Sequence, residues 1–342
     1  MAYPLIILGA GASFDNQSNV DFSDQHVLDK WHPPLTNNIF DTRRFYEILS
    51  KYEPQVSNLA AYISSKLKGG KLSFEDILTD LRTNKTSSNP DLIQQLVALR
   101  FYIADLFMAV SKNYFRTVNN YQTLIQIING TGRKACIVNF NYDLLFEKAF
   151  FSKLPEQVEE YINQEIKIIK LHGTCNWYFW RKINGWEQKS SYDFALLGAQ
   201  YVLDSESTKY PIVIKNVETS KNLPSVGNDP TTKFTYLPAV ALPLHRKLDY
   251  VCPDEHVNAM KSAIDGVDRI VIIGWKAGDP YLAQILNEQL KDKDIPIAVV
   301  CGKNSKDIIL GNLGNLAKNV KIIDQDGFSS FLNSNKCEKF LN

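Results

Sequence analysis

Short continuous apolar runs, each followed by turn residues, recur along the chain and predict its fold class. Leu5–Leu8 is the first, and it precedes a glycine-rich turn. A run of this length bounded by turn residues is typical of a strand that is buried on both faces. The same pattern predicts further strands at Ala135–Val138, Ile166–Leu171, Ile270–Ile273, Ile297–Val300 and Val320–Ile323. Together these runs predict an α/β fold with a parallel sheet of about six strands.

Helical periodicity dominates the long stretch between the first two apolar runs. The pattern predicts helices at Thr42–Lys51, Asn58–Leu67, Phe74–Leu81 and from Pro90 to about Tyr114. The last of these has more apolar positions than one helical stripe needs, so we expect it to be buried on several sides. Near the end of the sequence, Phe328–Leu332 predicts a short helix against the sheet. The prediction is a Rossmann-like sheet flanked by helices, with a large helical insertion after strand 1.

The stretch at about 176–250 mixes aromatic residues, polar loops and turn-rich segments, and it predicts an irregular insertion. Its one clear strand is Pro211–Ile214. Pro238, Pro243 and Pro253 predict that the following connection is extended rather than helical. We expect the chain, 1–342, to be a single catalytic domain. Its sheet-forming parts are predicted at about 1–40 and 130–332, and its helical insertion at about 41–129.

Composition narrows the classes of function. Lys plus Arg number 38 against 37 for Asp plus Glu, a formal charge of +1 that gives no global reason to bind nucleic acid or acidic membrane. The five cysteines form no Cys-x-x-Cys pair, which excludes the usual structural zinc spacing and argues against a disulfide framework. The apolar stretch Pro4–Ala12 lacks a basic lead and is interrupted by glycine, so neither a signal peptide nor a membrane span is expected. A cytoplasmic location is predicted.

Gly9–Ser13 follows the first apolar run and contains two glycines. Such a turn brings backbone amides close to a pyrophosphate at a helix start. The dinucleotide fingerprint has a third glycine where this chain has Phe14, and the second strand of dehydrogenases returns within about thirty residues. Here the second strand returns only near Ala135. A hydride-transfer enzyme is therefore disfavoured, and a plain strand-to-helix turn stays an alternative.

Polar residues also follow the second and third apolar runs. Asn141 and Asp143 come just before a helical stretch, where an amide and a carboxylate suit a ribose or a carboxamide, although both residue types also cap helices. His172 ends the third run and precedes Gly173, which permits close approach of a ligand; a structural histidine is the alternative. No second His or Cys stands at a ligand spacing from His172, so no metal is expected.

Taken in order, these segments resemble the sirtuin-like family. They are GAGAS at 9–13, NYD at 141–143, LHG at 171–173, and a strand closing on Gly274 with Asp279 five residues later. Within that family, they resemble specifically the bacterial sirtuin-like NAD hydrolases of anti-phage defence. The resemblance implies that the turn formed by Gly9, Ala10, Gly11, Ala12 and Ser13 holds the NAD phosphates, with Asp15 close by.

The resemblance also implies roles for the other segments. Asn141 would lie at the nicotinamide ribose, Asp143 at the nicotinamide amide, and His172 would be the general base on a ribose hydroxyl or on water. Gly274 and Asp279 would lie near the adenosine half. Two departures stand out: Tyr142 replaces the usual Ile, and Trp275-Lys276 replaces the small hydroxyl residue expected after Gly274.

Protein-deacetylating sirtuins carry two Cys-x-x-Cys pairs that bind a structural zinc. This chain has no such pair, so no zinc-ribbon module is expected in it. The resemblance therefore implies a hydrolase that cleaves the nicotinamide–ribose bond of NAD, its substrate, with no metal. It further implies a gated effector of anti-phage defence that acts by NAD depletion, a homo-oligomer, and a separate sensor such as a HerA-like ATPase or a short Argonaute. An NAD-dependent protein deacylase and a catalytically silent nucleotide-binding subunit are the alternatives.

Overall fold

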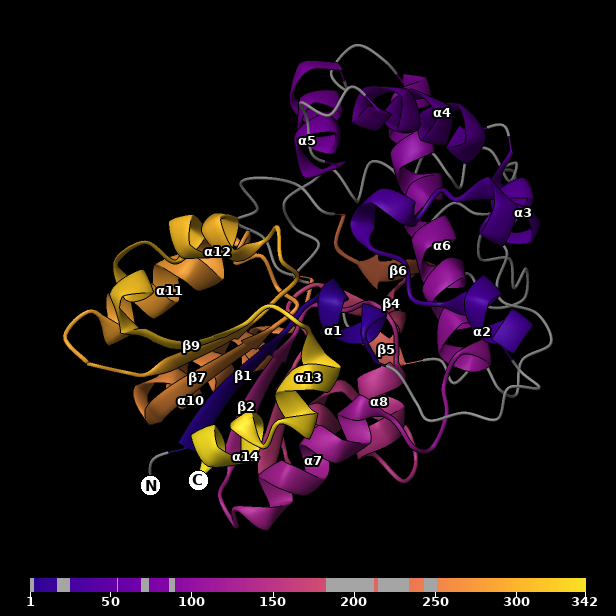
Figure 1. Ribbon diagram of the computed structural model, residues 1–342. Coiled ribbons are helices and arrows are strands. Elements are labelled where there is room, and N and C mark those ends of the chain that lie inside the picture. The colour runs from indigo at the N-terminus through magenta and orange to yellow at the C-terminus, as the bar shows by residue number, and fades with distance from the viewer. Residues whose placement is uncertain are drawn as a thin grey trace. The chain divides into compact units, whose positions relative to one another are not determined.

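The computed structural model describes residues 3–16, 25–53, 55–68, 74–85, 90–182, 212–214, 234–242 and 251–342 (Figure 1). They belong to two compact units. Unit 1 comprises Met1–Leu35, Val110–Leu171 and Asp254–Asn342; unit 2 comprises Thr36–Ala109 and His172–Pro253. No helix in the described ranges is long and apolar enough to cross a membrane.

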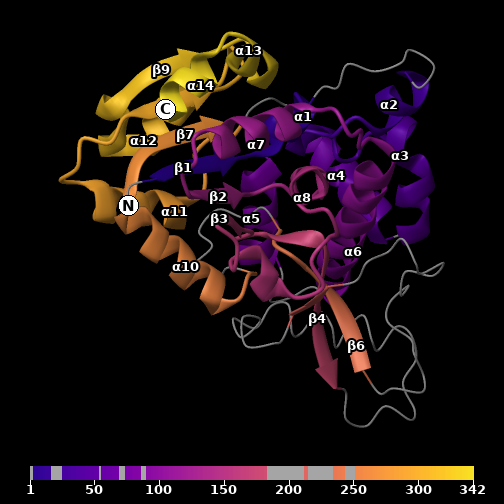
Figure 2. The same cartoon turned by 90° about the horizontal axis from the view of Figure 1, so that it is seen from below.

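Unit 1 contains a six-stranded sheet in which all neighbouring strands are parallel. Its strands are β1 (Tyr3–Leu8), β2 (Ala135–Asn139), β3 (Ile166–Ile169), β7 (Val267–Ile273), β8 (Ile297–Val300) and β9 (Val320–Asp324). They lie in the order β3-β2-β1-β7-β8-β9, and the labelled strands of Figure 2 follow this order. The predicted parallel sheet is confirmed. The order reverses at β1, so β1 and β7 form the switch point where open α/β sheets bind ligands.

The predicted third strand ends earlier than expected. The apolar run continues to Leu171, but β3 ends at Ile169, whose register partner is Val138 of β2. The next residue, Lys170, leaves the sheet and turns its fully buried side chain toward the segment that follows β2. The strand therefore ends where Lys170 contacts the Asn141 carbonyl, two residues before the end of the apolar run.

Two groups of helices flank the sheet of unit 1. One contains α7 (Asn120–Gly130), α8 (Leu145–Phe150), α13 (Phe328–Asn333) and α14 (Lys336–Leu341), which pack around α7. The other contains α10 (Asp254–Asp265), α11 (Pro280–Leu290) and α12 (Lys306–Leu313), with the 3-10 helix Gly314–Asn319. The short helices α1 (Ala10–Phe14) and α2 (Gln25–Trp31) and the 3-10 turn Val158–Tyr161 complete the unit. The strands lie between the two groups in Figure 1, as right-handed crossovers require.

Unit 2 combines helices with a small antiparallel sheet. The helices are α3 (Thr42–Leu49), α4 (Gln55–Lys68), α5 (Phe74–Lys85) and most of α6 (Pro90–Asn113), with 3-10 turns at Thr36–Asn38 and Ser50–Tyr52. The sheet has the order β5-β4-β6, formed by β4 (Gly173–Lys182), β5 (Ile212–Ile214) and β6 (Phe234–Val240). The predicted helical insertion after strand 1 is confirmed.

The prediction of a single strand in the stretch 176–250 was wrong. In the sequence, β4 precedes the expected strand and β6 follows it, and β6 contains Pro238 in its interior. Pro238 pairs with Tyr178 next to a register shift in β4, a place where a strand tolerates proline. All residues of β4 from Gly173 to Phe179 are buried, so this part of the strand lacks the alternation of buried and exposed positions that would have predicted it.

Candidate functional site

The glycine turn after β1 packs backbone to backbone against the turn after β7. Gly274 has φ +63°, and the N–H of Gly11 donates to its carbonyl at 3.0 Å. A Cβ at Gly274 would lie 2.2 Å from the backbone N of Ala12, and one at Gly9 would lie 2.6 Å from the Gly274 carbonyl oxygen. Both distances are shorter than any real Cβ contact. The glycines are therefore required by the junction of β1 and β7.

The same junction uses backbone amides that a phosphate site would offer. The N–H of Gly9 donates to the carbonyl of Ile273 at 2.9 Å, and the N–H of Ala12 donates to that of Gly9 at 2.8 Å. Ala10 begins α1, a helix of five residues. Backbone packing thus explains the glycines of this turn as a plain strand-to-helix connection. Phosphate binding by the turn stays a prediction.

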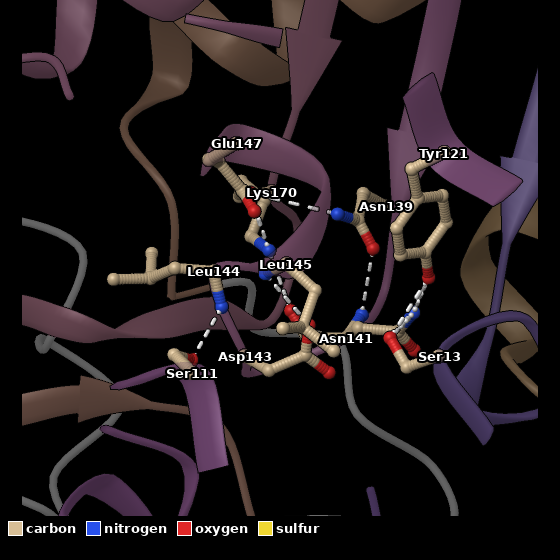
Figure 3. Close-up of polar contacts among 10 residues, drawn as sticks. All are labelled: Ser13, Ser111, Tyr121, Asn139, Asn141, Asp143, Leu144, Leu145, Glu147 and Lys170. Atoms are coloured by element: carbon tan, nitrogen blue, oxygen red, sulfur yellow. Dashed lines mark hydrogen bonds and ion pairs between the residues drawn. The ribbon is translucent and has the colours of Figure 1, made fainter. Parts of the chain in front are cut away.

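Ser13 points from α1 into a buried polar cluster with Tyr121 of α7 and Asn141 after β2 (Figure 3). The hydroxyls of Ser13 and Tyr121 lie 2.8 Å apart. Asn141 Nδ2 donates to Ser13 Oγ at 3.0 Å and to Tyr121 Oη at 3.1 Å. The carboxamide of Asn141 is therefore held by two hydroxyls.

The hydrogen bonds of this cluster determine which atom Asn141 has left over. The Nδ2 group of Asn141 has two hydrogens, and it donates to the Ser13 and Tyr121 hydroxyls. Asn141 therefore presents Oδ1 as an acceptor, and this oxygen accepts no hydrogen bond within the described residues.

Three side chains form a closed ring around the peptide groups of Asn141 (Figure 3). Its N–H donates to Asn139 Oδ1 at 3.0 Å, and its carbonyl accepts from Lys170 Nζ at 2.5 Å. Lys170 Nζ lies 2.8 Å from Glu147 Oε1, and Asn139 Nδ2 donates to the same oxygen at 3.5 Å. All four residues are buried, so the ring is shielded from water. Both the backbone and the carboxamide of Asn141 are thereby fixed in place.

Asp143 is a buried carboxyl at the start of α8. Burial raises its pKa, and this is opposed by the nearby Lys170 ammonium and by hydrogen bonds from the Leu145 N–H and from Ser13. The Leu145 N–H donates to Asp143 Oδ1 at 3.0 Å, although the N-cap residue of α8 is Leu144, which makes no side-chain cap hydrogen bond. Burial also raises the pKa of Tyr121, and the negative charge of Asp143 adds to that rise. The phenol of Tyr121 is therefore protonated and able to donate.

Asp15 and Asp279 make structural contacts. The Asp15 carboxylate accepts from the N–H and from the hydroxyl of Ser329, both at 3.0 Å, and so anchors the start of α13. Asp279 is the N-cap of α11, where Oδ1 accepts from the Leu282 N–H at 2.8 Å. NAD binding by these two carboxylates stays a prediction beside these roles.

His172 belongs to unit 2 and follows Leu171, the last residue of this segment in unit 1. Its carbonyl accepts from the N–H of Ala241 at 2.9 Å. Gly173 has φ +69°, and a Cβ there would lie 1.8 Å from the carbonyl oxygen of Ala239. Packing within unit 2 therefore explains the glycine after His172, and the catalytic role of the histidine stays a prediction.

Sequence reasoning missed Tyr121, Asn139, Glu147 and Lys170. Two of them carry a detectable signal, because Lys170 and Glu147 are charged residues inside mainly apolar runs. Tyr121 and Asn139 carry none, since their importance depends on what the fold places beside them. No group of His, Cys, Asp and Glu that could hold a metal is found among the described residues.

No family model matches the sequence, and no curated protein matches it. Among solved structures, a Sir2 homologue in complex with NAD matches over 99% of this chain and 91% of its own, at 10% identity and a TM-score of 0.46. A mutant Sir2 homologue in complex with ADP-ribose matches over 99% and 91%, at 9% identity and a TM-score of 0.44. Sir2Tm bound to a propionylated peptide matches over 99% and 94%, at 12% identity and a TM-score of 0.41. These values are too low to assign a ligand or an activity to this chain.

Proposed function

We propose that this protein is an NAD hydrolase that cleaves the nicotinamide–ribose bond and releases nicotinamide and ADP-ribose. The observation that carries the proposal is the fixed carboxamide of Asn141, whose Oδ1 is left as an acceptor at the carboxyl edge of a parallel sheet. A ribose hydroxyl and an attacking water both need such an acceptor. An amide can hold either one without titrating.

The proposed reaction needs positioning more than nucleophilic power. Nicotinamide departs with the electrons of the glycosidic bond and leaves an oxocarbenium-like ribose, to which water adds with loss of a proton. Asn141 holds the ribose or the water, and His172, as the family resemblance implies, accepts the proton. Histidine suits this role because its ordinary pKa lies near neutrality. Asp143 contacts the nicotinamide amide in this proposal.

The glycine turn is proposed to lie against the NAD phosphates. Support comes from its place at the switch point between β1 and β7, where Gly9 and Gly274 bring two backbones together without side chains. Gly274 is proposed to lie near the adenosine half. Asp15 and Asp279 are proposed to act at this end through the helices that they anchor.

The proposed physiological role is that of a gated effector in bacterial anti-phage defence, which ends infection by depleting NAD. A hydrolase that ran without control would be lethal to its own cell, so we propose that a separate protein activates it. A HerA-like ATPase or a short Argonaute is the candidate from the family resemblance, and self-assembly into a homo-oligomer is proposed with it.

Release of nicotinamide from NAD by the purified chain, alone and with a neighbouring gene product, tests the proposal. His172→Ala and Asn141→Ala are expected to abolish the release while circular dichroism and thermal unfolding show a folded protein. Wild-type turnover in either variant would contradict the role assigned to that residue.

The products separate the alternatives. Formation of O-acetyl-ADP-ribose from acetylated peptide and NAD would identify a deacylase instead. NAD binding without any turnover, under every condition tried, would identify a silent nucleotide-binding subunit.

A further inference from the structure

The segment that carries Asn141 leads from β2 into α8, and the first N–H groups of a helix need acceptors from outside it. One of them, the N–H of Leu145, donates to Asp143 within the segment itself. The N–H of Leu144 donates to Ser111 Oγ at 2.8 Å, a contact that spans 33 residues of the sequence (Figure 3). Ser111 is fully buried and lies on α6. A helix of the insertion thus supplies one of the contacts that hold the Asn141 segment.

Helix α6 has residues in both compact units. It is one helix of 24 residues, Pro90–Asn113. It belongs to unit 2 as far as Ala109 and to unit 1 from Val110 onward. A helix is a rigid element, so its two parts are expected to change position together.

The part of α6 in unit 2 has polar anchors of its own. The buried hydroxyl of Tyr102 donates to the Ile39 carbonyl, and the hydroxyl of Tyr52 donates to Asp105 Oδ2 at 2.6 Å. At a rise of about 1.5 Å per residue, Tyr102 and Asp105 lie about 14 Å and about 9 Å along the helix axis from Ser111. A displacement at either anchor is therefore expected to reach Ser111 through the helix itself.

We propose that Ser111 is a positioning residue for the Asn141 segment, and that α6 makes turnover depend on the state of the helical insertion. The inference rests on the proposed function and gives the gate proposed there a place in the fold. When α6 is displaced, the Leu144 N–H loses its acceptor, and a buried N–H without a partner is costly. The segment then shifts, and Asn141 shifts with it. An activator that stabilises the insertion would act on the site in this way.

The first test compares Ser111→Ala with Ser57→Ala. Ser57 on α4 is a matched control, because its hydroxyl is also buried but has no hydrogen-bond partner. Ser111→Ala is expected to lower kcat for NAD hydrolysis at least about fivefold, the lower end of measured couplings between sites. KM for NAD should stay nearly unchanged, and Ser57→Ala should follow the wild type. A loss of stability in Ser111→Ala with unchanged kcat overturns the positioning role.

A second test asks whether α6 carries the effect. Tyr52→Phe removes the hydrogen bond to Asp105, so kcat is expected to fall in the wild-type background. The same change is expected to have no further effect on kcat in Ser111→Ala, where the contact with the Asn141 segment is already lost. Changes at residues this far apart usually add. Additive effects, or no effect of Tyr52→Phe on kcat, overturn the role of α6.

Hydrogen exchange gives a readout that needs no NAD turnover. Ser111→Ala and Tyr52→Phe are each expected to speed amide exchange in the peptide 141–150, whereas Ser57→Ala is not. Unchanged exchange of this peptide in Tyr52→Phe overturns the inference even if the protein hydrolyses NAD. Faster exchange in both variants, without NAD hydrolysis by the wild type, would overturn the proposed function alone.

Discussion

The glycine turn after β1 and the Asn141 segment after β2 follow neighbouring strands, and both resemble ligand-binding motifs in the sequence. The two segments are held in place by different contacts. The glycines of the first segment are required by close backbone packing on Gly274, with or without a ligand. The second segment is held by side chains, and one atom, Asn141 Oδ1, is left over for a ligand. We therefore expect changes in the first to affect mainly stability and changes in the second to affect mainly catalysis.

The largest expected effect tests the first half of this comparison. Gly274→Ala should lower the free energy of unfolding by more than about 3 kcal/mol, or prevent folding, because the new Cβ would overlap the backbone of Ala12 and the positive φ is strained for alanine. Urea unfolding measures the loss. Gly278→Ala is the matched control, since a Cβ there meets nothing within 4 Å, and it is expected to change stability by less than about 0.5 kcal/mol. Equal losses in both variants would contradict the packing account.

A smaller effect tests the second half. Tyr121→Phe removes one of the two acceptors for Asn141 Nδ2 and the hydroxyl that hydrogen-bonds Ser13, so kcat for NAD hydrolysis is expected to fall about tenfold. The free energy of unfolding should fall by only about 1–2 kcal/mol. Tyr281→Phe on α11 controls for the loss of a tyrosine hydroxyl elsewhere in unit 1. A loss of stability with unchanged kcat would show that the carboxamide does not depend on Tyr121.

The smallest effect concerns Asp15, which lies next to the glycine turn. Asp15→Ala should lower the free energy of unfolding by about 1 kcal/mol, because the start of α13 loses the acceptor for the Ser329 N–H and hydroxyl. Urea unfolding measures this change, and Ser329→Ala should reproduce part of it. A parallel rise in KM for NAD would place Asp15 at the ligand as well, as the family resemblance implies. No change in stability would contradict the anchoring role.

Most of the elements followed from the sequence because buried strands and amphipathic helices leave a hydrophobic period. The strand Ile297–Val300 was predicted with its observed bounds. The helix predicted at Phe74–Leu81 begins at the same residue in the structure and continues to Lys85. The antiparallel strands β4 and β6 were missed because consecutive residues, Gly173–Phe179 and Pro238–Val240, are buried on both faces, which removes the alternation that marks a strand.

The residues of the candidate site were likewise predicted only where the hydrophobic pattern pointed to them. Asn141, Asp143 and the glycine turn were predicted because they directly follow apolar runs, and parallel strands place such residues at one edge.

Hydrophobic spacing by itself determined the parallel sheet and its helices, since burial of apolar side chains depends on local periodicity. Only the tertiary structure decided the order β3-β2-β1-β7-β8-β9, the packing of Gly9 on Gly274, and the ring of Asn139, Glu147 and Lys170 around Asn141. These contacts join residues that are distant in the sequence, and a hydrogen bond depends on where two atoms meet in space. The tertiary structure also decided which atom of the Asn141 carboxamide is left for a ligand, because Nδ2 donates to the Ser13 and Tyr121 hydroxyls.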